Sequence, residues 1–225
     1  MELYCQRVLL RSRSRSCQNE SVPRSRFDEL VALAEENDGL VTAEQARQAG
    51  FTDSVLARLA QRARIERTAR GVFRIPHFPP GRFSQYREAV LWAKANRGPR
   101  DVALSRATAL VIYGISDANP SAIHLTVPKS ARLRRQKPKG VVVHREDLTP
   151  DDVAVQEGIP VTTVSRTVTD LLRSGGRIDL VRQAISDARR EGFIGDTEAR
   201  RLRRRVEAHI KSLSAARSRT EPAAR

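Results

Sequence analysis

The sequence predicts an α+β protein with an N-terminal winged helix-turn-helix, a small mixed sheet covered by helices, and a helical C-terminus. Three observations lead to this fold class. Three short helical patterns are followed directly by two β-type runs around a glycine, which is the order of a winged helix-turn-helix. Strand-like runs at 122–128, 140–146 and 152–158 are flanked by further helical patterns. The chain then ends in a long arginine-rich helical pattern.

The charge of the chain favours a polyanionic partner. Its 225 residues contain 41 lysines and arginines against 26 aspartates and glutamates, which gives a formal net charge of +15. Such an excess is typical of proteins that bind nucleic acid or an acidic membrane surface. No apolar run approaches the roughly 18–20 residues of a membrane span, and the N-terminus lacks the pattern of a signal peptide. We therefore expect a cytoplasmic protein with no membrane partner.

Composition divides the chain into four parts. Residues 1–25 contain the run RSRSRS and no sustained periodicity, so we expect a disordered basic tail. Both cysteines, Cys5 and Cys17, lie in this tail, which excludes a disulfide framework. Patterned sequence then forms a winged region at 26–80 and an α+β region at 83–212, and a second tail expected to be disordered follows at 213–225.

Spacing and capping predict the first two helices. Apolar residues recur at i, i+3, i+4 and i+7 from Phe27 to Ala34, which predicts the first helix. Thr42 and Gln45 have the spacing of a capping box, and Gly50 is a typical helix stop, so a short second helix is expected between them. The sequence AGFT then provides the corner between the second helix and the third.

The third helix is the expected recognition helix, with Thr52 as its N-cap. It is too short to be stable alone, so an apolar stripe from Val55 to Ala63 is expected to pack on the first two helices. The opposite face is then free for the major groove of DNA, where Arg58 and Gln61 are expected to reach base edges.

The run ERTARGVFR at 66–74 is the expected wing. Its two β-type runs flank Gly71, which permits a sharp hairpin turn. Its arginines would contact phosphates or the minor groove. The complete set of expected DNA-contacting residues is Thr52, Ser54, Arg58, Gln61, Arg62, Arg67, Arg70 and Arg74. The alternative is a small structural domain with a solvated basic rim.

The second region begins after the breaker PHFPPGRF. Helical patterns are expected over 83–96, 104–114, 164–174, 177–191 and 196–212, around the three strand-like runs. Ser105 is the expected cap of the second of these helices and Gly114 its expected end. Arg166 and Asp170 lie one helical turn apart, and we expect them to form an i,i+4 ion pair.

These motifs resemble a known family. The run LARLAQRARIERTARGVFRIP looks like the winged-helix module of AbiEi-type antitoxins from bacterial type IV toxin–antitoxin systems. The similarity continues through LSRATALVIYGI, AIHLTVP and GIPVTTVSRTVTDLL, in which Arg166-Thr167 and Asp170 are similar to a recurring element of the family's C-terminal domain. Residues 27–175 are covered. Ala63 departs from the family pattern, which often has glycine at the end of the recognition helix.

The resemblance implies a function and partners. AbiEi-like proteins repress their own operon by binding repeated promoter sequences, and they counteract a nucleotidyltransferase-class toxin encoded alongside. The implied partners are double-stranded operator DNA and that toxin, with a homodimer on DNA as one arrangement. An alternative is a protein-interaction module that neutralises a toxin by direct binding without binding DNA.

No constellation of residues indicates an enzyme. His124 and His144 lie in separate strand-like runs, and we expect hydrogen-bonded histidines there rather than a metal site. A nuclease, the third alternative, needs clustered carboxylates, whereas the acidic residues after position 175 are scattered over arginine-rich helices. We therefore expect no catalytic residue, no metal and no cofactor.

A second basic cluster lies between two strand-like runs, in the segment KSARLRRQKPKG at 129–140. It is either a second anion-binding or partner-binding loop or a solvated, flexible hairpin loop, and the sequence favours neither. The residues concerned are Lys129, Arg132, Arg134, Arg135, Lys137 and Lys139.

Overall fold

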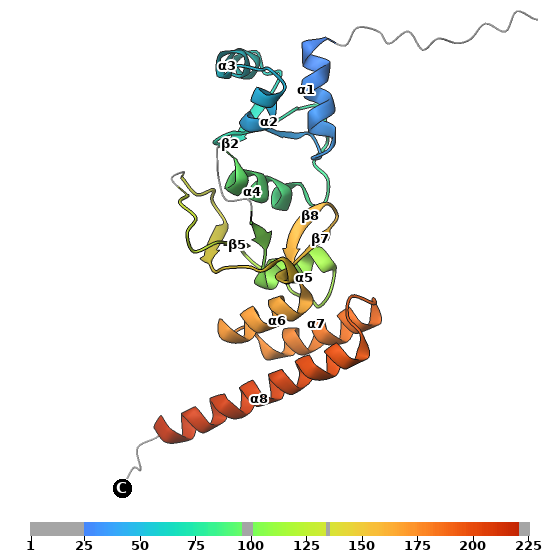
Figure 1. The fold of residues 1–225 in the computed structure, drawn as a ribbon, viewed down its shortest axis with the longest axis vertical. Coiled ribbons are helices and arrows are strands. Elements are labelled where there is room, and N and C mark those ends of the chain that lie inside the picture. The colour runs from blue at the N-terminus through green and yellow to red at the C-terminus, as the bar shows by residue number, and fades with distance from the viewer. Residues whose placement is uncertain (1–24, 96–100, 134–135, 221–225) are drawn as a thin grey trace, which may run out of the picture.

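The computed structural model describes residues 25–95, 101–133 and 136–220 (Figure 1). Within these ranges it contains eight α-helices, a three-stranded sheet and a five-stranded sheet. The predicted α+β class, with an N-terminal helix-turn-helix and a helical C-terminus, is confirmed. Residues 1–24 and 221–225, which belong to the two expected tails, lie outside the described residues.

The N-terminal part has the predicted element order with one additional strand. The three helices are α1 (Arg26–Glu35), α2 (Ala43–Gln48) and α3 (Asp53–Gln61), and the strands are β1 (Leu40–Thr42), β2 (Glu66–Ala69) and β3 (Val72–Arg74). The wing hairpin β2–β3 was predicted, but β1 was not. It pairs antiparallel with β3, so the sheet order is β1-β3-β2.

Local capping explains where these helices begin. The Thr42 side chain accepts a hydrogen bond from the backbone N–H of Gln45, whose own side chain accepts one from the N–H of Thr42, as predicted. A second capping box, not predicted, joins Ser25 and Asp28 at the start of α1. Ser25 therefore belongs to the ordered winged region rather than to the tail in which the sequence placed it.

The second region forms the five-stranded sheet and the remaining helices. The strands are β4 (Ala103–Leu104), β5 (Ile123–Val127), β6 (Val141–Arg145), β7 (Val153–Gln156) and β8 (Ile159–Thr162), in the order β6-β5-β4-β8-β7. The helices are α4 (Ser84–Lys94), α5 (Arg106–Tyr113), α6 (Val164–Arg173), α7 (Ile178–Arg190) and α8 (Asp196–Thr220), with a 3-10 turn at Pro150–Asp152. The sheet is mixed, because β5–β6 and β4–β8 are parallel pairs while β4–β5 and β7–β8 are antiparallel.

The pairing of β5 with β6 corrects one sequence interpretation. The strands are parallel, in the register Ile123 with Val141 through Val127 with Arg145. The intervening basic segment is therefore not a hairpin loop, since a hairpin joins antiparallel strands. It is a crossover that must return along the sheet before β6 can start.

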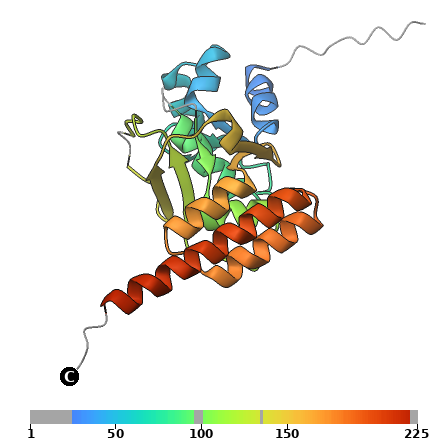
Figure 2. The same cartoon turned by 60° about the horizontal axis from the view of Figure 1, so that its bottom comes forward.

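The last three helices lie side by side on the side of the molecule away from the winged part (Figures 1 and 2). Leu202 and Val206 of α8 are fully buried there, together with Val181 and Ile185 of α7. The helix α8 continues to Thr220 and projects past its neighbours, so the expected helix end at residue 212 was too early. Most of the second expected tail is thus helical.

The helix α4 links the two parts of the molecule. It lies against β1 and β3 on one side and against β4, β5 and β8 on the other. Leu40 and Val72 of the winged sheet are fully buried and belong to the same apolar core as Trp92 of α4. Arg87 of α4 adds polar contacts in both directions. Its Nε donates to Asp38 at 3.0 Å, and its Nη2 donates to the Glu157 carbonyl of the β7–β8 turn at 2.8 Å.

Candidate nucleic-acid interface

The recognition helix α3 presents a polar stripe to solvent. Leu56 is buried against the winged core, whereas Ser54, Arg58, Gln61 and Arg62 are exposed. These four residues are spaced i, i+4, i+7 and i+8, so they share one face of the helix and its C-cap. The structure therefore brings together the α3 residues that the sequence assigned to DNA.

The two ends of α3 have distinct roles. Thr52 caps its start, because its side chain accepts from the N–H of Val55 and lies 2.9 Å from the Ser54 hydroxyl. At the other end, Ala63 has a φ of 51° and an exposed side chain. Ala63 is therefore not on the buried stripe as predicted. It occupies the left-handed conformation that ends the helix, which glycine adopts without strain.

Two of the three wing arginines also face solvent. Arg67 and Arg70 are exposed on β2 and on the turn that follows it. Gly71 has a φ of 84° and is buried, and its carbonyl accepts a hydrogen bond of 2.9 Å from the N–H of Ala43 at the start of α2. The wing turn is thus fixed to α2, and Gly71 is needed for its backbone conformation.

Arg74 does not belong to this surface. Its side chain is only 14% exposed, and its Nη2 lies 3.7 Å from the Glu88 carboxylate of α4. It points into the junction with the second region, so we withdraw it from the expected DNA contacts. The sequence could not show this, because the position of α4 on the winged sheet depends on tertiary packing.

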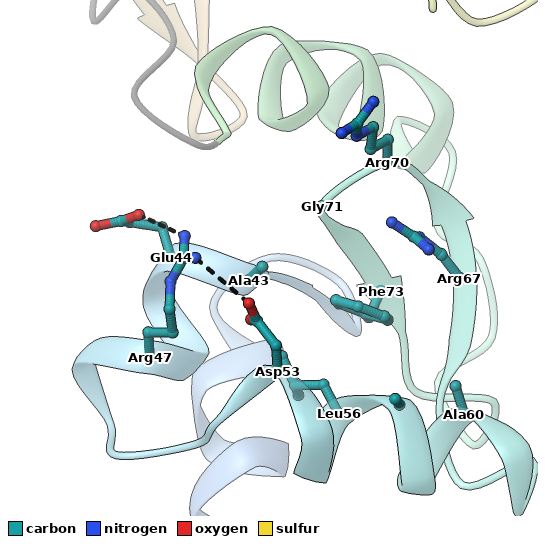
Figure 3. Close-up of a pocket in the computed structure, with 11 residues that line it drawn as sticks. Ala43, Glu44, Arg47, Asp53, Leu56, Ala60, Arg67, Arg70, Gly71 and Phe73 are labelled. Atoms are coloured by element: carbon teal, nitrogen blue, oxygen red, sulfur yellow. Dashed lines mark hydrogen bonds and ion pairs between the residues drawn. The ribbon is translucent and has the colours of Figure 1, made fainter. Parts of the chain in front are cut away.

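A groove of about 780 Å³ lies between α3 and the wing (Figure 3). Arg67 and Arg70 form its hairpin wall, and Leu56, Ala57, Ala60 and Phe73 lie among its apolar lining. Across from them are Glu44 and Arg47 of α2 and Asp53 of α3. The sequence analysis did not identify these three residues. Asp53 could have been found, because it follows the N-cap directly and therefore lies at the start of the recognition helix.

The charges across the groove are unequally paired. Arg47 lies 2.8 Å from the Glu44 carboxylate but 3.9 Å from that of Asp53, whose side chain is 74% exposed. By contrast, the side chains of Arg58, Arg62, Arg67 and Arg70 make no ion pair or hydrogen bond with any described residue. Four exposed guanidinium groups thus remain available, two on α3 and its C-cap and two on the wing beside the groove.

The second basic cluster lines a shallow hollow of about 670 Å³ with Arg145 of β6. Of this cluster, Lys129 and Arg132 line the hollow, Lys137 and Lys139 are exposed, and Arg134 and Arg135 lie outside the described residues. Asp147 fixes the start of the segment, because its carboxylate accepts a hydrogen bond of 3.0 Å from the Lys129 backbone N–H. Arg145 donates to the carbonyl of Ala131 and so anchors the segment to β6.

A buried ionic network stabilises the second region. Arg166 Nε donates to both carboxylate oxygens of Asp170 at 2.9 Å, which confirms the predicted i,i+4 pair. Its Nη2 reaches Glu146 at 2.7 Å, and Arg106 donates to the other Glu146 oxygen at 2.8 Å. Burial opposes ionisation of Glu146, but the two guanidinium groups outweigh it and lower the pKa of this carboxyl. Burial raises the pKa of Asp170, whose side chain is fully enclosed.

The two strand histidines pair with each other. His124 Nδ1 lies 2.9 Å from His144 Nε2, and the rings stack with centroids 5.2 Å apart. Burial and the neighbouring Arg106 lower the pKa of both imidazoles, that of His144 to about 4. Both rings are therefore neutral at pH 7. No group of three or more potential metal ligands occurs within the described ranges.

None of the helices in the described part of the chain is both long and apolar enough to span a bilayer.

Comparison with known proteins agrees with this architecture. Residues 28–76 match the family described as transcriptional regulator, AbiEi antitoxin, and residues 102–218 match the AbiEi antitoxin C-terminal domain. The fold is similar to that in the crystal structure of RV2827C protein from Mycobacterium tuberculosis, with a TM-score of 0.50 and 19% identity over 80% of this chain and 71% of that one. No curated protein matches the sequence. Since the C-terminal match alone spans more than half of the residues, the chain belongs to the AbiEi family of antitoxins and transcriptional regulators.

Proposed function

We propose that this protein is an antitoxin that binds double-stranded operator DNA, represses its own operon and counteracts a nucleotidyltransferase-class toxin. The observation that supports DNA binding most directly is the set of four exposed arginines without partners in the described structure. Arg58 and Arg62 lie on the recognition helix and its C-cap, and Arg67 and Arg70 lie on the wing, where they line the groove. An unpaired, exposed guanidinium group is suited to phosphate and to base edges.

The recognition helix and the wing would make different contacts with DNA. Arg58 and Gln61 of α3 would reach base edges in the major groove, with Ser54, Thr52 and Arg62 beside them. Arg67 and Arg70 of the wing would contact the phosphate backbone or the minor groove, because the groove between helix and wing is open to a passing strand. Affinity would come mainly from the wing and sequence preference from the helix.

Binding titrations test this division. Arg58→Ala should cost about 1–3 kcal/mol on the preferred sequence and relax the preference, whereas Arg70→Ala should weaken all sequences alike. Fluorescence anisotropy with the upstream promoter and a scrambled duplex measures both effects. Arg190→Ala is the matched control, since Arg190 is exposed on α7 at the far side of the molecule. Unchanged affinity in both test variants would refute the assignment.

The antitoxin role is proposed for residues 83–212, with the segment 129–140 as a second contact for anions or for the toxin. This segment forms a basic hollow with Arg145 and is anchored at Asp147 and Ala131. The protein would act by binding in the cytoplasm, without catalysis, and two copies would occupy repeated operator sites. Growth rescue of cells that express the nucleotidyltransferase-like neighbour tests protection, and a promoter reporter tests repression. Protection without repression would support the protein-interaction alternative.

A further inference from the structure

A carboxylate occupies a position in the proposed interface where the phosphate backbone would repel it. Asp53 is the first residue of α3, its side chain is 74% exposed, and it lines the groove between α3 and the wing. Figure 3 shows it across the groove from the wing arginines. Its surroundings do not neutralise it fully, because Arg47 lies closer to Glu44 than to Asp53.

The place of Asp53 in the helix points to a contact with a base. The N-terminal residues of a recognition helix are those that lie nearest to base edges when the helix enters the major groove. Ala57 follows Asp53 by one turn and also lines the groove, so its short side chain leaves room for a base pair to approach. Arg67 and Arg70, on the opposite wall, would hold the phosphates of the strand whose bases Asp53 faces.

We infer that Asp53 is a specificity-determining residue, whose carboxylate accepts a hydrogen bond from the exocyclic amino group of a cytosine. A carboxylate can only accept, and cytosine N4 is the amino group with which Asp and Glu pair in the major groove. This inference rests on the proposed DNA-binding function. It adds that the sequence preference includes a cytosine opposite the start of α3, and that sequences without it are rejected because the Asp53 carboxylate then has no base donor while it lies beside phosphate.

Arg47 assists this contact by positioning the carboxylate. It lies within ion-pair range of both Glu44 and Asp53, so it limits the directions in which Asp53 can point. Loss of Asp53 should therefore have two separable effects. Non-specific affinity rises because a negative charge leaves the interface, and discrimination at one base pair falls because the acceptor is gone.

Selection from randomised duplexes by the full-length protein tests the inference. Wild type, Asp53→Ala and Asp53→Asn are compared. The control is Asp179→Asn, another exposed aspartate in the first turn of a helix with an arginine partner, on α7 far from α3. We expect wild type and control to enrich a motif with a cytosine that Asp53→Ala no longer selects, at a loss of about fivefold or more in discrimination. Asp53→Asn should favour adenine there, since an amide pairs with adenine N6 and N7. Circular dichroism checks that the variants fold.

The possible outcomes distinguish failure of the Asp53 inference from failure of the proposed DNA-binding function. If the Asp53 variants enrich the same motif as wild type and only bind all duplexes more tightly, Asp53 merely repels phosphate and the inference is overturned. If wild type itself enriches no sequence, the proposed operator binding fails, and the inference fails with it.

Discussion

Removal of α4 should unfold the winged module. A fragment of residues 26–80 retains every element of the winged helix-turn-helix but loses the helix that covers Leu40 and Val72. Both side chains are 0% exposed in the whole chain. Uncovering two such aliphatic side chains costs about 3–6 kcal/mol at about 1.5–3 kcal/mol each. A domain of this length has a total stability of only about 3–8 kcal/mol, so the loss is comparable with all of it.

Urea unfolding followed by circular dichroism is the assay. We expect 26–80 to show no cooperative transition and to bind DNA weakly at best. A fragment of residues 26–95 restores the cover and should regain a transition, although Trp92 on its other side is then exposed. A sharp transition for 26–80 with a midpoint near that of the whole chain would show that the winged core does not depend on α4.

Three further predictions concern stability. Ala63→Gly should stabilise the protein by about 1 kcal/mol, since Ala63 is exposed and has a φ of 51° that glycine adopts without strain; no gain in urea midpoint would contradict this. Asp170→Ala should destabilise it by about 3–5 kcal/mol, because Arg166 is left buried with an incomplete set of partners; a loss below 1 kcal/mol in the same assay would show that its remaining partners suffice, namely Glu146 and Asp152, whose carboxylate lies 3.3 Å from Arg166 Nη1. Stability should also fall as the pH drops from about 6.5 towards 4, because the unfolded chain takes up protons there while the lowered pKa values keep His124 and His144 neutral in the folded state. Thermal melts across this range should be flatter for His144→Asn, and an equally steep profile would assign the effect to other groups.

Local rules explain which elements could be predicted. The Thr42–Gln45 capping box and the Gly71 turn act over a few residues, and both are present as expected. The strands β4 and β8 were not predicted, because they depend on pairing with distant strands and not on a local sequence pattern. β4 has only two residues, and β8 contains Pro160, which sequence patterns treat as a strand breaker. Each exists because of the strands beside it.

The candidate site was likewise predictable only where a local pattern determines it. The helical period placed Ser54, Arg58 and Gln61 on one exposed face, and the structure agrees. The period could not reveal that Arg74 turns towards Glu88, since those residues meet only when α4 packs on the winged sheet. Nor could it show that Asp53 faces the wing arginines, which lie on a different element.

The packing of α4 against both sheets has a consequence for how modules can be exchanged between family members. A winged module moved from another family member would arrive with its own β1 and β3 surfaces, and these must fit the α4 of the recipient. Arg87 makes the requirement stricter, because it needs both an acceptor like Asp38 on one side and the turn carbonyls at Glu157 on the other. Exchange of operator preference between relatives should therefore succeed with a breakpoint in the segment after α4, near residues 96–100, and fail with one before it. Under the proposed DNA-binding function, the unit that carries sequence preference is then the winged helix-turn-helix together with its covering helix.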